Sequence, residues 1–140
     1  MPERDLSVAI LRAAAKVTSE LDELLGAYGL SEPQFNTLRI LRGAARGGLP
    51  TQQIAERLIT RQPDITRLVD RLIEAGWARR RRCEEDRRVV YVVLTPAGRK
   101  LLARLDGPVD ALHRRQFAHL GRAEVRALAG LLAKLCAGEE

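Results

Sequence analysis

The sequence has few aromatic residues, few cysteines and only three lysines. Aromatic side chains make up 4% of the chain, so its core must be built mainly from Leu, Ala, Val and Ile, which favours packed helices. Two cysteines, Cys83 and Cys136, are too few for a disulfide framework or a cysteine-rich zinc site, and a reducing cytoplasm is the expected location. The two histidines lack partners at metal-ligand spacing, so we expect no metal and no cofactor.

No hydrophobic run approaches the roughly 20 residues that a membrane-spanning helix needs. The first amphipathic segment carries Glu3 and Asp5, which argues against a secretory signal. The sequence also lacks a glycine-rich phosphate loop, an HExxH motif and a nucleophile with a placed base, so it offers no candidate catalytic residues. We therefore expect neither a membrane protein nor an enzyme.

Arginine is what the sequence has in excess. The formal net charge is +6, and all but three of the 24 basic residues are arginine. The excess is concentrated between Ser31 and Gly98, where 13 arginines and no lysine stand against 8 acids, whereas the two flanks are nearly balanced. This distribution is expected if the middle of the chain binds a polyanion such as double-stranded DNA.

Apolar residues at helical spacing predict a first helix over residues 6–25 and a second that begins after Ser31. Ser31 and Gln34 occupy the two positions of a capping box, in which each side chain bonds the other residue's backbone N–H. A short third helix follows Pro50, with an inward face formed by Ile54, Ala55 and Leu58.

A tight turn over residues 59–62 separates the third helix from a fourth, which Pro63 is expected to begin. Gly76 suits the position just past its end. Two strands over 77–82 and 88–94 then predict a β-hairpin. One continuous apolar stripe marks the fourth helix as amphipathic, with Ile65, Leu68, Val69, Leu72 and Ile73 in it.

Two more helices are predicted after the hairpin. The first has Thr95 as its cap and Pro96 as its first position, and Gly107–Pro108 should kink or break it, because proline removes a backbone donor. Phe117 continues its apolar face, and the last helix follows Gly121. The fold class is therefore mainly α with a small β-hairpin wing. We predict a winged helix–turn–helix lobe over 31–98, flanked by dimerisation helices over 1–28 and 99–140, all within a single domain over 1–140.

The start of the fourth helix carries the residue types that read base edges. An α-helix fits the major groove, where Gln bonds adenine, Arg bonds guanine and the methyl group of Thr touches thymine. Asp64 either accepts a hydrogen bond from cytosine or stabilises the positive end of the helix. The alternative for the whole set is an ordinary solvated surface. The candidate DNA-binding residues here are Gln62, Asp64, Thr66, Arg67 and Arg71.

The hairpin carries six arginines within ten residues, and we expect some of them, including Arg81 and Arg88, to contact DNA. A guanidinium at the tip of a narrow hairpin fits a minor groove, where A·T-rich sequence concentrates negative potential. Asp86 is expected to hold Arg88 outward through a fork-shaped ion pair. The alternative is a solvated turn with weak surface salt bridges.

The first and last helices are apolar on more positions than one side of a small lobe can bury. Such faces must meet another surface, and a twofold homodimer is the commonest solution. A monomer that folds these helices back on itself is the alternative. The expected dimerisation residues are Leu6, Ile10, Leu128, Leu131, Leu132 and Leu135.

Five stretches of the sequence together resemble the MarR family of winged helix–turn–helix transcriptional regulators: Gly29–Phe35, Ile54–Leu58, Ile65–Leu72, Glu85–Arg88 and Leu94–Gly98. Their order and spacing extend the resemblance over nearly the whole chain. The resemblance implies a homodimer that reads a near-palindromic DNA site and that we expect to be a repressor. The family's wing residues map onto Asp86 and Arg88, and its recognition-helix readers onto residues 62–67.

The resemblance further implies a small aromatic or phenolic effector, which in many members binds between the dimerisation helices and the lobe and releases DNA. In this sequence such a pocket would be lined by aliphatic residues such as Leu24.

Some members sense peroxide through a cysteine in the first helix, which has none here. Cys83 lies among arginines that favour a reactive thiolate, although chance placement is the stronger interpretation. A PadR-like repressor and a winged-helix protein-interaction module are the alternative functions.

Overall fold

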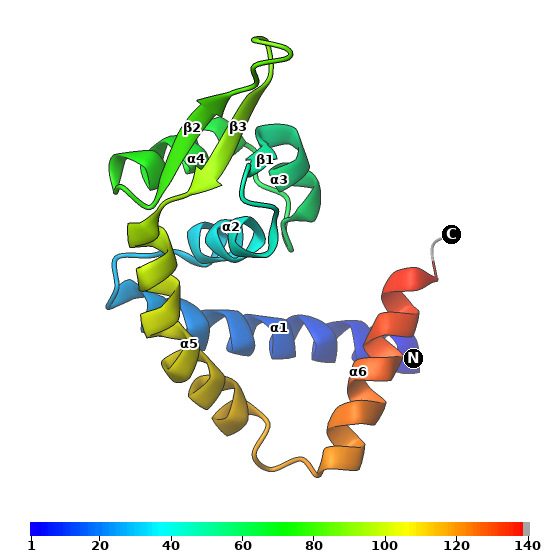
Figure 1. Ribbon diagram of the computed structural model, residues 1–140. Helices are drawn as coiled ribbons and strands as arrows, with labels where there is room; N and C mark the ends of the chain where they lie inside the picture. Colours follow the sequence, from blue (N-terminus) through cyan, green and yellow to red (C-terminus); the bar gives the residue numbers. More distant parts are fainter. Residues whose placement is uncertain (139–140) are drawn as a thin grey trace.

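In the computed structural model, which describes residues 1–138, a winged lobe lies above α1 and is joined by α5 to a final helix (Figure 1). The helices run beneath and beside the lobe, and α6 returns toward the N-terminal end of α1 (Figure 1). The chain is mainly helical with a small sheet, as the sequence predicts. Its elements are α1 (Pro2–Gly26), α2 (Glu32–Gly43), β1 (Leu49–Pro50), α3 (Thr51–Arg57), α4 (Ile65–Glu74), β2 (Ala78–Arg82), β3 (Val90–Leu94), α5 (Pro96–Gln116) and α6 (Arg122–Ala137).

The start of α2 has the predicted capping box. The hydroxyl of Ser31 accepts a hydrogen bond from the backbone N–H of Gln34 at 3.3 Å, and the side-chain oxygen of Gln34 accepts one from the N–H of Ser31 at 2.9 Å. A carboxylate from α1 also joins this helix end, because Asp22 accepts from the N–H of Glu32 at 3.1 Å. The N-terminus of α2 is therefore fixed to α1 as well as to itself.

The helix–turn–helix consists of α3, the turn after it and α4, but two details of the prediction were wrong. Ala55 is exposed instead of facing the core, because α3 is only two turns long and Ile54 alone is fully buried. The fourth helix begins at Ile65 and not at Pro63, because Asp64 caps it: its carboxylate accepts from the N–H of Arg67 at 2.9 Å.

The sheet has the strand order β1-β3-β2, and both pairings are antiparallel. The hairpin register places Ala78 opposite Leu94 and Arg82 opposite Val90. The strand β1 pairs Leu49 with Val92 and was not predicted, since two residues are too few to show a period of two.

One hydrophobic core holds the lobe to the long helices. Its buried side chains come from α1, α2, α3, α4, the sheet and α5, and their removal from water is the main stabilising contribution to the lobe. The fully buried members include Leu25, Leu38, Ile54, Val69, Leu72, Val92, Leu102 and Leu105. This core fixes α4 and the hairpin relative to each other.

The helix α5 is continuous across Pro108, so the predicted break there is wrong. Pro108 itself is exposed, whereas Leu105, Val109 and Leu112 on the other face are buried. Their burial outweighs the cost of one missing backbone donor. Phe117 does not continue the buried face, because it caps the C-terminus of the helix and is 37% exposed.

Two polar contacts orient α5. At its start, the hydroxyl of Thr95 accepts from the N–H of Gly98 at 3.1 Å and donates to the carbonyl of Gly76 at 2.6 Å. Farther along, Arg42 at the end of α2 donates two hydrogen bonds to Asp106, at 2.9 and 3.0 Å. The ion pair with Arg42 holds the pKa of Asp106 below its usual value.

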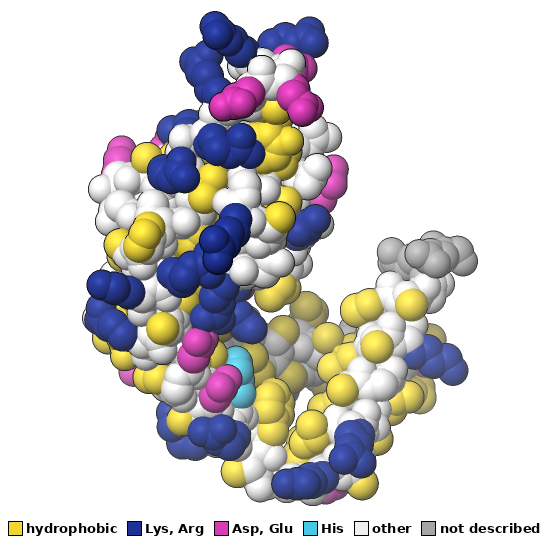
Figure 2. All heavy atoms as spheres, viewed as in Figure 1, with side chains coloured by type: hydrophobic (Ala, Val, Ile, Leu, Met, Phe, Trp, Pro, Cys, Tyr) yellow, Lys and Arg dark blue, Asp and Glu magenta, His cyan; other side chains and the backbone are white. Residues whose placement is uncertain are grey.

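The two ends of the described chain carry apolar side chains that this single copy leaves in water. None of the residues of α6 is buried, and Leu6 of α1 is 57% exposed. Figure 2 shows hydrophobic side chains along α6. Within residues 1–138, no helix combines the length and the apolar character required to cross a bilayer.

Candidate nucleic-acid interface

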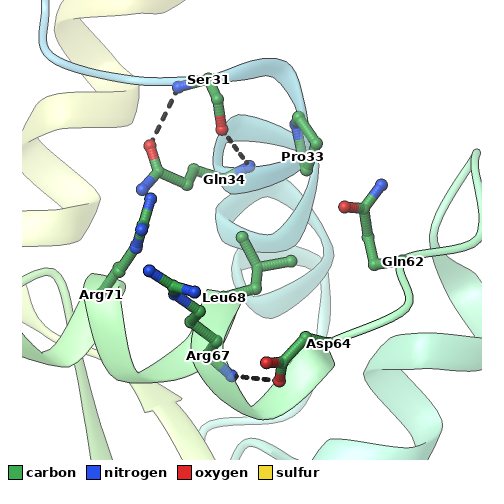
Figure 3. Close-up of a pocket in the computed structure, with 8 residues that line it drawn as sticks. All are labelled: Ser31, Pro33, Gln34, Gln62, Asp64, Arg67, Leu68 and Arg71. Carbon is green, nitrogen blue, oxygen red and sulfur yellow. Dashed lines mark hydrogen bonds between the residues drawn. The ribbon is translucent and has the colours of Figure 1, made fainter.

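A polar hollow of about 340 Å³ lies between the N-terminus of α2 and the start of α4. Figure 3 shows its residues: Arg67 and Arg71 project from α4 toward Gln34, and Gln62 lies on the turn before the helix. Four of the five predicted readers line it, namely Gln62, Asp64, Arg67 and Arg71. The fifth, Thr66, is exposed outside it.

Arg67 and Arg71 have the chemistry of an anion-binding pair. Within residues 1–138 neither has an ion pair with a carboxylate, and both side chains border the hollow. A guanidinium presents parallel N–H donors that match a phosphate or the edge of guanine. The two side chains can therefore bind either the backbone or a base of a nucleic acid.

Asp64 was predicted with two alternatives, and its geometry matches the second. Its carboxylate accepts from the backbone of Arg67, so it satisfies one of the free N–H groups at the start of α4. A carboxylate used in this way stabilises the helix and orients the next turn, which carries Arg67 and Arg71.

The wing tip contains the predicted ion pair. The Nε of Arg88 donates to one oxygen of Asp86 at 3.1 Å, and its Nη2 donates to the other at 3.3 Å. The backbone N–H of Arg88 also donates to Asp86, at 3.0 Å. These bonds hold the pKa of Asp86 below its usual value, and the side-chain bonds have the larger effect. The side chain of Arg88 is 92% exposed, so it is held at the surface with its outer edge free.

Arg81 is engaged within the lobe and is not a free wing side chain. It donates to the carbonyl of Gly47 at 3.0 and 3.3 Å and stacks on Tyr91, with 4.6 Å from its Cζ to the ring centroid. The pleat of β2 places Arg81 on the sheet face that carries Tyr91, from which its side chain reaches the loop before β1. This contact joins residues 34 positions apart, and sequence reasoning missed it. Arg81 therefore fixes the outer part of the hairpin to the loop before β1.

A second contact that the sequence did not indicate joins the wing to α4. Arg80 of β2 forms an ion pair with Asp70 of α4, and both side chains are about half-exposed. This ion pair therefore engages a further hairpin arginine within the lobe. Four hairpin arginines have no carboxylate partner in residues 1–138; Arg81 is one of them and is engaged by Gly47, and the others are Arg79, Arg82 and Arg87. Figure 2 shows Lys and Arg side chains at the hairpin tip and along the visible face of the lobe.

A separate cavity of about 320 Å³ lies between α1, α2, α5 and the turn after α3. It is where the effector pocket was expected, but Leu24 does not line it. Leu24 lies one turn farther along α1 and borders another hollow with Leu112 and Arg115. The cavity combines apolar and polar side chains, namely Val17, Thr18, Leu21, Glu32, Phe35, Asn36, Arg39, Ile59, Thr60 and His113.

Two titratable groups in this cavity have defined surroundings. Burial raises the pKa of Glu32, and the negative charge of Asp22 raises it further. The ring of His113 is oriented by the buried Gln116, whose side-chain N–H₂ donates to the carbonyl of Val17 at 3.3 Å. The amide oxygen of Gln116 therefore accepts from Nδ1 of His113, 2.9 Å away, and leaves Nε2 for another partner.

All six predicted dimerisation residues line one apolar groove of about 640 Å³ between the N-terminal part of α1 and α6. Leu131 is 66% exposed and Leu135 55% exposed. A smaller apolar hollow beside it, lined by Phe117, Leu120 and Val125 among others, was not predicted. Together they leave one continuous hydrophobic surface along α6.

The cysteines form no cluster with other ligands. Cys83 is half-buried and Cys136 is exposed, and both are free thiols. Within residues 1–138, no group of three or more His, Cys, Asp or Glu side chains is arranged to hold a metal ion.

Comparison with known proteins gives one consistent result. The model of the MarR family matches residues 30–90. The HTH-type transcriptional regulator FarR of Neisseria gonorrhoeae is 27% identical over 135 residues, which cover 96% of this chain and 91% of FarR.

Solved structures agree with the sequence comparison. The crystal structure of a MarR transcription factor from Planctomyces limnophilus is 42% identical, covers 93% of this chain and 94% of its own, and has a TM-score of 0.74. The crystal structure of Sco3205, a MarR family regulator from Streptomyces coelicolor in complex with DNA, has a TM-score of 0.89 over 98% of this chain and 87% of its own. At 23% identity, the second match shows the shared fold.

Proposed function

Because this chain belongs to the MarR family of DNA-binding transcriptional regulators, we propose that it acts in the cytoplasm as a sequence-specific repressor. It binds a near-palindromic operator in double-stranded DNA as a homodimer. One observation carries this proposal. The protein presents Arg88, held outward at the wing tip, and also Arg67 and Arg71 of α4, whose guanidinium groups have no carboxylate partner within residues 1–138.

The two surfaces have different tasks in this proposal. The start of α4 enters the major groove, where Gln62, Thr66 and Arg67 read base edges and Arg71 binds the backbone. The wing tip inserts Arg88 into the adjacent minor groove, where narrow A·T-rich sequence attracts a guanidinium. Arg81 and Asp64 act indirectly, by fixing the outer part of the hairpin and the start of α4.

The exposed leucines of α1 and α6 support the homodimer. Folded monomers rarely leave apolar surface of this kind in water, and a twofold partner covers it with the same residues from a second copy. Two lobes related by a twofold axis bind two half-sites of opposite orientation, which is why the operator is near-palindromic.

The cavity between α1, α2 and α5 supports release of DNA by a small aromatic or phenolic effector. It is bounded by α1 and α5 and by the turn that leads to α4, so an occupant touches both the long helices and the lobe. A phenolic hydroxyl can donate to Nε2 of His113 beside the ring of Phe35. We expect 4-hydroxybenzoate to release operator DNA from the native protein and to do so less well from His113→Leu.

Affinity selection of genomic DNA fragments by the purified protein at physiological salt tests the proposal. An enriched inverted repeat, with half-sites about one helical turn (~10 bp) apart, is the expected result. Enrichment without a common sequence would reduce the activity to non-specific charge binding. Retention of no DNA would favour the protein-interaction module instead.

The salt dependence of binding measures the electrostatic part of the proposal. Each phosphate contact releases counterions, so the logarithm of the affinity should fall linearly with the logarithm of salt concentration, with a slope of about −0.9 per contact. A flat dependence would contradict a role for the arginine surface.

A further inference from the structure

The turn between α3 and α4 is attached to the rest of the lobe by very few contacts. The side chain of Ile59 is 78% exposed, and Thr60, Arg61 and Pro63 are exposed as well, so burial does little to fix this segment. The last backbone bond of α3 runs from the N–H of Leu58 to the carbonyl of Ile54. The first bonds of α4 are those to Asp64.

Between these two helix ends, one hydrogen bond joins the turn to another element within residues 1–138. The side-chain oxygen of Asn36, on α2, accepts from the backbone N–H of Ile59 at 2.9 Å. The two residues are 23 positions apart, and Asn36 is half-buried in the wall of the cavity. Because this bond is made to the backbone, it restricts the turn directly, although the bond itself lies at the surface.

A further hydrogen bond links the residue after Ile59 to one of the proposed DNA-reading residues. The hydroxyl of Thr60, the next residue, accepts a hydrogen bond from the side chain of Gln62 at 3.3 Å. Gln62 borders the same polar hollow as Arg67 and Arg71 (Figure 3). Asn36 itself lies on the cavity side of α2 and does not line that hollow.

We propose that Asn36 is a positioning residue for DNA recognition: its hydrogen bond to the N–H of Ile59 sets the turn that presents Gln62 and the start of α4. This inference rests on the proposed function, because it assigns Asn36 a role in the same base-reading segment. Asn36 contributes to specificity without touching DNA.

A matched pair of substitutions separates the hydrogen bond from packing. Asn36→Leu keeps the approximate size of the side chain and removes the acceptor, whereas Asn36→Asp keeps an acceptor oxygen at the same position. Asn36→Leu should lower affinity for the selected operator roughly three- to tenfold, the value of one net hydrogen bond, and leave affinity for unrelated DNA unchanged. Asn36→Asp should retain the ratio of specific to non-specific affinity.

A second variant removes the donor instead of the acceptor. Ile59→Pro lacks the backbone N–H, and Leu58 already has the extended conformation that a residue before proline prefers, with φ −63° and ψ 141°. It should reproduce the loss seen in Asn36→Leu, and the double variant should lose no more than either single one. This arm keeps the test valid if Asn36→Leu does not fold.

Two readouts distinguish positioning from a general structural role. The amide of Ile59 should exchange its hydrogen faster in Asn36→Leu and not in Asn36→Asp, and the loss in Asn36→Leu should be smaller in a Gln62→Ala background. Unchanged operator affinity in Asn36→Leu overturns the proposal. So does a loss that is equal in Asn36→Asp and that follows a lowered melting temperature. If the native protein selects no sequence at all, the proposed function fails, while Ile59 exchange still reports whether Asn36 holds the turn.

Discussion

Arg88 differs from the other hairpin arginines because a carboxylate two residues away holds its guanidinium by two bonds. The side chain is nevertheless 92% exposed, so the bonds restrict its rotamers without covering its outer N–H groups. A side chain ordered in advance loses less conformational entropy on binding than a free one.

Arg88→Ala should therefore weaken operator binding by about 1–3 kcal/mol, or roughly 5- to 140-fold. Fluorescence anisotropy with a labelled operator measures the loss, and sedimentation checks that assembly is unchanged. Arg87→Ala is the matched control, because it removes the same charge from a neighbouring residue that has no carboxylate partner within residues 1–138. Equal losses in the two variants would show that only the charge of the tip matters.

Gly98 shows how closely α5 approaches the hairpin. A Cβ added there would overlap the carbonyl oxygen of Trp77 and come within 2.7 Å of Leu94. Gly98→Ala should lower the free energy of unfolding by about 1–3 kcal/mol, as overpacking does. Gly26→Ala, where the added Cβ meets nothing within 4 Å, should be neutral or stabilising by up to ~1 kcal/mol. Urea unfolding of both variants tests this; a Gly98→Ala protein as stable as the native one would contradict the packing described.

At the scale of elements, the ion pair between Arg42 and Asp106 connects α2 to α5. The helix α2 also bonds the turn after α3, through Asn36. Its partners are 29% and 49% exposed, so the pair contributes only about 0–1 kcal/mol. Because the pKa of Asp106 is lowered by folding, this contribution is complete above the ordinary aspartate pKa and is lost as pH falls through the lowered value.

Asp106→Asn should consequently reduce stability slightly at pH 7, and the difference from the native protein should disappear in strong acid. Thermal unfolding at a series of pH values measures both ends of this range. Asp110→Asn provides the comparison on the same helix, because Asp110 is exposed and has no ion pair within residues 1–138. A deficit that persists at low pH would mean that the carboxylate acts through packing and not through its charge.

Elements whose causes are local could be predicted from the sequence. The capping box of Ser31 and Gln34 and the ion pair of Asp86 and Arg88 each involve residues two or three positions apart, so spacing alone indicates them. The amphipathic face of α4 was equally legible. The start of α4 was misplaced because Pro63 suits a first turn and Asp64 suits a cap, and only one of these two interpretations can hold.

Contacts between distant residues could not be predicted in this way. The engagement of Arg81 by Gly47 and Tyr91 depends on β1, a strand too short to leave a pattern. The bond from Asn36 to Ile59 joins positions 23 residues apart and depends on how α2 packs against the turn. Pro108 was misjudged because local propensity predicts a break, whereas the buried leucines beside it keep α5 whole.

At the scale of the whole molecule, a single copy leaves the apolar surface of α1 and α6 uncovered. Leu131→Glu places a charge in that groove and should shift the protein from dimer to monomer while the lobe stays folded. Operator affinity should fall with it, because each monomer holds only one half-site.

Sedimentation velocity measures the assembly, and circular dichroism measures the folding of the lobe. Ala103→Glu, which adds the same charge to an exposed position of α5, is the control and should remain dimeric. A dimeric Leu131→Glu protein would move the interface elsewhere.

The composition of the wing tip has a consequence for the kinetics of binding. The loop and its ends carry three arginines, Arg82, Arg87 and Arg88, and three acids, Glu84, Glu85 and Asp86, so the tip has no net charge. Beyond a Debye length of about 8 Å its charges cancel, and the tip contributes little to the long-range attraction that accelerates association. In the proposed DNA complex, its contacts are expected to form only after the lobe has reached the DNA. We therefore expect the wing to affect the lifetime of the complex, and the arginines on the body of the lobe to affect the rate at which it forms.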